Sequence, residues 1–101
     1  MNQMQQMLMQ AQKMQRELAK AQAALATQEF KVSKAGIVEV VLLGDRSIKS
    51  IDIDADALDP DSKEMVEETI VLAINEALAT IEEANEKIQE EITGQKGGLG
   101  F

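Results

Sequence analysis

Apolar residues recur in a heptad pattern along the first quarter of the chain. The members of this pattern stand at intervals of 4, 3, 4, 3 and 4 residues: Met7, Ala11, Met14, Leu18, Ala21 and Leu25. Such spacing places them on one seam of a helix, as in a coiled coil. It predicts a helix over about residues 3–27, roughly 37 Å long at 1.5 Å per residue. A small sheet cannot cover a helix of this length, so part of it must project or pair with a second helix.

The period changes between residues 29 and 54. Phe30 and Val32 form a short alternating pair, and the segment 37–43 is a β-branched run that we expect to be covered on both faces. The segment 48–54 alternates Ile51 and Ile53 with Asp52 and Asp54, which predicts a strand with one buried and one solvent-facing side. Turn signals separate the three segments. We therefore expect a three-stranded antiparallel meander.

A second long helix follows the strands. Asp59 fits its N-cap and Pro60 its first position, where the missing N–H of proline has no cost. Its apolar residues again repeat at intervals of 4, 3, 4, 3 and 4: Ile70, Ile74, Ala77, Ile81, Ala84 and Ile88. Gly94 predicts the C-terminal end of this helix. The pattern predicts an α+β fold of order α-β-β-β-α, with one domain over residues 1–94 and a flexible glycine-rich tail over 95–101.

Composition adds that this domain is small and lacks large side chains. The 101 residues include two Phe and no Trp or Tyr, so a compact core is hard to fill and self-association is expected. The chain has no Cys, which suits a reducing compartment. No apolar run is long enough to span a membrane, and the N-terminus lacks a signal-peptide pattern. We expect a cytoplasmic protein without a membrane partner.

Charge is distributed unevenly along the chain. Residues 1–34 carry a net charge of +3, whereas residues 50–101 carry −11 in a chain of −8 overall. Lys13, Arg16 and Lys20 fall on one face of the first helix, and Gln12 and Gln15 lie nearby as further donors. This surface suits the backbone of a nucleic acid. A solvated face of a coiled coil is the simpler interpretation of three cations taken alone.

Other candidate chemistry fails on inspection. A calcium-binding loop beginning at Asp52 would need Gly and Glu where the chain has Ala57 and Lys63. The chain has no His and no Cys, and no Ser lies beside an evident base. The sequence therefore predicts no enzyme activity, no metal, no cofactor and no small-molecule substrate.

Taken together, the ordered pattern resembles the YbaB/EbfC family of bacterial nucleoid-associated proteins. Four features carry the resemblance besides the Gly-Gly-Leu-Gly tail: the opening helix with Lys-Met-Gln-Arg-Glu-Leu at 13–18, the strand at 48–54 after Gly44, Leu-Asp-Pro at 58–60, and the helix at 70–77. The resemblance implies a homodimer whose helices project to embrace double-stranded DNA. It also implies that Lys13, Arg16 and Lys20 contact DNA, and that the protein lies in the nucleoid and influences gene expression.

The leading hypothesis is therefore a dimeric, non-enzymatic DNA-binding protein, whose binding should be weak and strongly salt-dependent in so acidic a chain. The alternative is a prefoldin-like chaperone or coiled-coil adaptor. Two heptad helices flanking strands also fit that architecture, and methionine-rich helix ends suit the capture of apolar partners.

Overall fold

The computed structural model describes residues 2–94 and has the predicted α-β-β-β-α order. The long helices and strands are α1 (Gln3–Ala26), β1 (Glu29–Lys34), β2 (Val38–Leu43), β3 (Ile48–Ile53) and α2 (Lys63–Thr93). Two short 3₁₀ helices, η1 (Ala55–Ala57) and η2 (Pro60–Ser62), connect β3 to α2. The glycine-rich segment 95–101, expected to be a flexible tail, lies outside the described residues.

The sheet is an antiparallel meander in the order β1-β2-β3. Its register places Val32 opposite Val40 and Val40 opposite Ile51, with an irregularity between Val41 and Leu42. The β1–β2 turn passes through Gly36 at φ +67°, a left-handed conformation that glycine adopts without a steric penalty. Because side chains alternate between the two faces of a strand, this register assigns one face of the sheet to the core.

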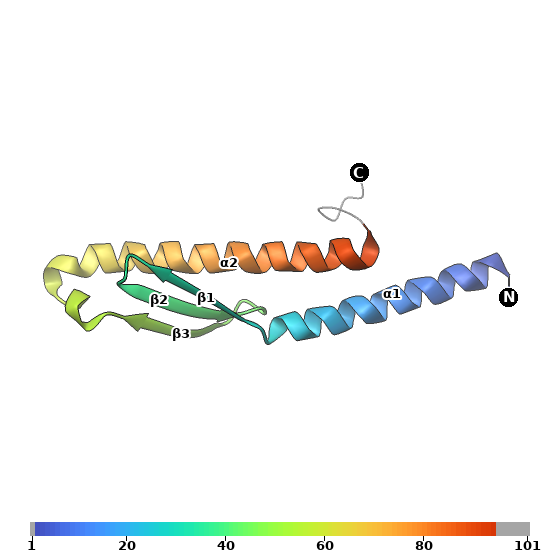
Figure 1. Cartoon of the computed structure of the whole chain (residues 1–101), viewed down its shortest axis with the longest axis horizontal. Coiled ribbons are helices and arrows are strands. Elements are labelled where there is room, and N and C mark those ends of the chain that lie inside the picture. The colour runs from blue at the N-terminus through green and yellow to red at the C-terminus, as the bar shows by residue number, and fades with distance from the viewer. Residues whose placement is uncertain (1, 95–101) are drawn as a thin grey trace.

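Helix α2 packs across β1 and β2 on that face (Figure 1). Ala73 and Ala77 of the helix are small, whereas the sheet residues are β-branched or larger, so the two layers approach closely at these alanines. The core residues from the sheet are Phe30, Val32, Val38, Val40 and Leu42, and those from the helix are Val66, Ala73, Ala77 and Ile81. Ile70, Ile74, Ala84 and Ile88 are half-buried beside them, which confirms the predicted apolar seam of the second helix.

The start of α2 has the predicted cap and proline, but the type of its first turn differs from the prediction. The Asp59 carboxylate accepts a hydrogen bond from the backbone N–H of Ser62 at 3.0 Å, and Pro60 occupies the first position of η2. The capped turn is thus a 3₁₀ turn, which continues into the α-helix at Lys63. At the other end, Gly94 adopts φ +72° and donates to the carbonyl of Glu90 at 2.8 Å, so the predicted stop is confirmed.

The predicted burial of one side of β3 is wrong for the single chain. Ile51 is 43% exposed and Ile48 50% exposed, and Ile53 is only half-buried. The reason is the placement of α2, which lies over β1 and β2 and leaves the same face of β3 open. In β2 both faces are covered in part, because Val41, on the face away from α2, is 7% exposed.

Helix α1 projects from the end of the sheet, as its length predicted (Figure 1). Its last turns lie beside the second half of α2, and its first turns extend beyond the end of that helix. The molecule measures 71 × 26 × 14 Å, with a radius of gyration of 19.5 Å. A compact chain of this length has a radius near 13 Å. The single chain is therefore an extended body with much of α1 uncovered.

Candidate nucleic-acid interface

The three predicted DNA-contacting cations lie on the exposed surface of α1. This helix begins at a cap that the sequence interpretation missed, where the Asn2 side chain accepts a hydrogen bond from the Gln5 backbone N–H at 2.8 Å. Lys13, Arg16 and Lys20 then follow in its middle turns, all three exposed to solvent. We refer to Lys13, Arg16 and Lys20 as the basic stripe.

The basic stripe lies on the side of α1 that faces away from α2. At about 100° per residue, its centre is roughly 150° around the axis from the seam that contains Leu25. That seam is the side that contacts α2: Leu25 is 6% exposed, and Leu18 and Ala21 are half-buried. The acidic surface of α2 and the basic stripe are thus on opposite sides of α1.

The remaining predicted site residues are less well aligned. Gln12 is exposed and borders the basic stripe, whereas Gln15 is exposed but lies toward the seam side of the helix. Met9, 53% exposed, stands four residues before Lys13 and extends the line of the stripe toward the N-terminus. The sequence interpretation did not assign Met9 to this face, although the i, i+4 spacing was the signal that places it there.

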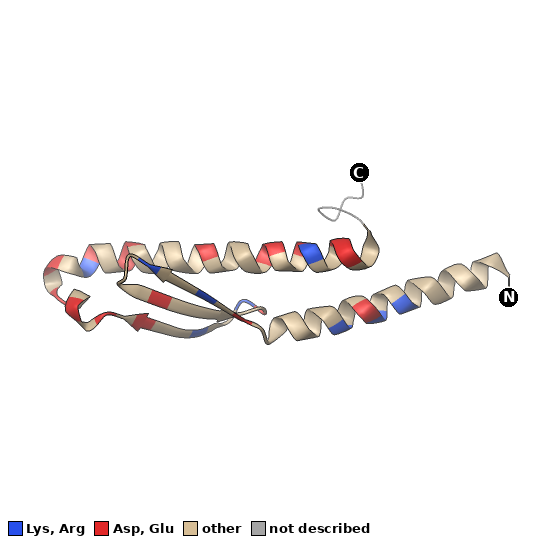
Figure 2. Ribbon diagram, viewed as in Figure 1, with Lys and Arg blue, Asp and Glu red and all other residues tan. Residues whose placement is uncertain are grey.

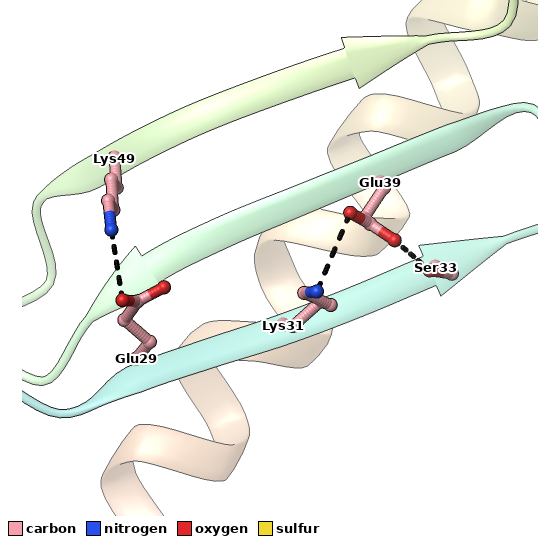
Figure 3. Close-up of polar contacts among 5 residues, drawn as sticks. All are labelled: Glu29, Lys31, Ser33, Glu39 and Lys49. Carbon is pink, nitrogen blue, oxygen red and sulfur yellow. Dashed lines mark hydrogen bonds and ion pairs between the residues drawn. The ribbon is translucent and has the colours of Figure 1, made fainter.

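Cations in the sheet and its turns are paired with carboxylates. Their amine or guanidinium nitrogens lie 2.6–3.9 Å from a partner oxygen: Lys31 with Glu39, Lys34 with Glu76, Arg46 with Glu82, and Lys49 with Glu29. Two of these pairs lie side by side on the face of the sheet away from α2, where Ser33 also donates to Glu39 (Figure 3). All eight partners are a third or more exposed, so the pairs contribute little to stability. The pairs do, however, neutralise the cations of the sheet and its turns.

By contrast, no carboxylate oxygen in the part of the chain that the structure describes lies within 4.0 Å of Lys13, Arg16 or Lys20. Lys63 and Lys87 of α2 are likewise unpaired within residues 2–94. Figure 2 shows the blue bands of α1 gathered in its middle, where the acid of this helix, Glu17, also lies, while red bands recur along α2. The basic stripe is therefore the one run of three neighbouring unpaired cations on an element of the described chain.

Hollows elsewhere on the surface are less suited to an anion. One of about 600 Å³ opens at the end of the sheet beside η1, and its lining includes Glu39, Asp52 and Asp54. Carboxylates in this arrangement would repel phosphate. Across residues 2–94, no helix is both long and apolar enough to pass through a membrane.

Comparison with known proteins agrees with the charge pattern in pointing to DNA. The profile of the YbaB/EbfC DNA-binding family matches residues 1–96. A protein of Enterococcus faecalis named nucleoid-associated protein is 40% identical over 103 residues, covering 100% of this chain and 96% of its own length. Proteins of the same name from Lachnospira eligens and Mycoplasmopsis pulmonis are 45% and 39% identical, over 78% and 89% of this chain and 69% and 89% of their own lengths.

Proposed function

Because the chain belongs to the YbaB/EbfC DNA-binding family, we propose that it is a non-enzymatic, nucleoid-associated protein that binds double-stranded DNA through the basic stripe of α1. The observation that carries this assignment is the contrast among cations. Those of the sheet and its turns are held by carboxylates, whereas those of the stripe are exposed and unpaired. Unpaired cations can release the counterions of DNA without first breaking an ion pair.

The geometry of the stripe suits the DNA backbone. From Lys13 to Lys20 the helix rises by roughly 10 Å at 1.5 Å per residue, which allows contact with successive phosphates of one strand. Gln12, beside the stripe, can donate to a phosphate or a base edge, and Gln15 is expected to contribute less because it faces the seam side. Phosphate contacts position a protein on DNA without reading sequence. We therefore expect binding with little sequence preference.

A salt series tests the assignment. Each phosphate that a cation neutralises contributes about 0.9 to the slope of log affinity against log salt. Replacing Lys13, Arg16 and Lys20 by Ala should reduce this slope and weaken binding to a duplex in fluorescence anisotropy. The matched control replaces Lys63 and Lys87, which are also unpaired but lie on α2, and should have a much smaller effect per charge removed. Equal effects per charge would show that the stripe is not the contact surface.

We also propose that the protein binds DNA as a homodimer formed through the open side of β3. Two ion pairs orient α2 over the sheet: Glu76 bonds Lys34 at the end of β1, and Glu82 bonds Arg46 in the β2–β3 turn. Because α2 lies over β1 and β2, the same face of β3 is left open, with Ile48 50% and Ile51 43% exposed. Ile48 and Ile51 thus form an open apolar surface, which we call the β3 face.

The β3 face supports self-association because isoleucines on an exposed edge strand favour pairing with another chain. Sedimentation of the purified protein gives the test, since a dimer has twice the 11.0 kDa of one chain. Ile51→Glu should convert the dimer to a monomer. Leu72→Glu is the control, because Leu72 is 62% exposed but lies on α2 rather than on β3. A dimer that survives Ile51→Glu would place the interface elsewhere.

One observation still supports the alternative of a chaperone or coiled-coil adaptor, namely the exposed methionines at the start of α1. Suppression of aggregation of an unfolded client, unaffected by DNA, would favour it. The family membership and the unpaired basic stripe favour DNA.

A further inference from the structure

The seam of α1 becomes steadily more exposed toward the N-terminus. Leu25 is 6% exposed, Met14 39%, Met7 68% and Met4 79%. The gradient follows the end of α2, which terminates at Thr93 while α1 continues beyond it (Figure 1). One continuous apolar seam is thus covered by α2 near the sheet and left open at the far end of α1. We call Met4, Met7, Ala11 and Met14 the tip seam.

This far end of α1 is also the least charged part of the molecule. Residues 2–12 contain no Asp, Glu, Lys or Arg, although the chain as a whole carries a net charge of −8. Figure 2 shows this part of α1 without a blue or red band. Two copies of so acidic a chain repel one another over most of their surfaces, and that repulsion is smallest where they meet through uncharged segments. The neighbouring Gln side chains can hydrogen-bond across such a contact.

The orientation of the tip seam leaves the basic stripe free. The two lie roughly 150° apart around the axis of α1 at about 100° per residue. A second helix packed on the tip seam would continue the contact that α2 makes nearer the sheet, and it would not cover Lys13, Arg16 or Lys20. The heptad spacing of the seam is typical of a helix that pairs with another helix.

From these three observations we propose that the tip seam is a second self-association surface, which packs against the tip seam of another copy of this chain. It is separate from the β3 face. A chain with both surfaces assembles beyond a dimer, so that copies bound to two DNA segments hold those segments together. The contact itself does not require DNA, and its test is therefore independent of the DNA-binding proposal.

Cysteine cross-linking provides the test, because the sequence contains no Cys and a single introduced thiol is unique. Met7→Cys places the thiol on the tip seam. Met9→Cys is the matched control, since Met9 is the same residue type, is similarly exposed at 53%, and lies on the opposite side of the helix. Under mild oxidation, Met7→Cys should form covalent dimers at least about tenfold faster, because pairing raises the local thiol concentration and brings Cβ atoms within disulfide range.

The same comparison is made in an Ile51→Glu background, which removes association through the β3 face. The Met7→Cys cross-link should persist there, with a yield that rises with protein concentration. Equal rates for the two thiols, or loss of the Met7→Cys cross-link in the Ile51→Glu background, would overturn the proposal. If the cross-link forms and the basic-stripe variants still bind DNA normally, the DNA assignment fails while the tip contact stands.

Discussion

Gly44 should be irreplaceable because it lies against the end of α1. It is buried, and its backbone N–H donates to the carbonyl of Gln28 at 3.0 Å, which ties the β2–β3 turn to the end of the helix. A Cβ atom at this position would lie 1.8 Å from the carbonyl oxygen of Leu25 and 2.6 Å from its carbonyl carbon. Reaching even 3.0 Å from that oxygen requires a shift of about 1.2 Å between two backbone segments. No side-chain rotation can relieve such a contact.

We expect Gly44→Ala to lower the free energy of unfolding by about 3 kcal/mol, the upper part of the range for overpacking, since backbone rather than side-chain atoms must move. Urea denaturation at a fixed protein concentration measures the loss. Gly36→Ala is the control: its Cβ would meet no atom within 4 Å, but φ is +67°, so its cost should be about 1 kcal/mol, from backbone strain alone. Hydrogen exchange should show α1 opening in Gly44→Ala only. A loss in Gly44→Ala no greater than in Gly36→Ala would refute the steric argument.

Two further predictions concern the core and the β2–β3 turn. Ile81 is fully buried, so Ile81→Ala should cost about 2–5 kcal/mol in urea denaturation, whereas Leu72→Ala, at an exposed position, should leave the midpoint nearly unchanged. In the turn, hydrogen bonds from the Ser47 hydroxyl and backbone N–H lower the pKa of Asp45 below its ordinary value of 3.8. This contribution to stability is present above that value and is lost as pH falls through the lowered pKa. Ser47→Ala should raise the pKa of Asp45 in an NMR titration, and an unchanged pKa would contradict the assignment.

The elements of this fold could be predicted from sequence because each one is set by local chemistry. The two heptad seams identified both helices, and Asp59 with Pro60 marked the turn that starts the second one. The alternation at 51–53 correctly indicated a strand. Its predicted burial was wrong, because alternation shows that one face of a strand is apolar but not whether a helix lies over it. That depends on how α2 is placed across the sheet, which is a property of tertiary packing.

For the candidate site, too, one part could be predicted from the sequence and another part could not. The spacing of Lys13, Arg16 and Lys20 was enough to place them on one face of a helix. Pairing between cations and carboxylates was not visible in the sequence, because Arg46 and Glu82 are 36 residues apart and meet only in the folded chain. That pairing is what separates the basic stripe from the other cations. The role of Gly44 was hidden for the same reason, since its close neighbour Leu25 belongs to a different element.

The acidity of the chain and its DNA-binding role can be reconciled by the position of the carboxylates. The acidic helix α2 packs on the seam side of α1, and the basic stripe is on the far side. For DNA bound at the stripe, as proposed, the body of α1, about 10 Å wide with its side chains, would separate the acids from the DNA. The Debye length is about 8 Å at physiological ionic strength and about 30 Å at 0.01 M. Repulsion between α2 and DNA is therefore screened in the first condition and unscreened in the second. The affinity for DNA should therefore rise less steeply as salt is diluted than it would if the stripe were the only charged surface. The slope of log affinity against log salt should flatten once the Debye length exceeds the width of α1. A slope that stays constant down to 0.01 M salt would mean that the acids of α2 lie too far from DNA to matter.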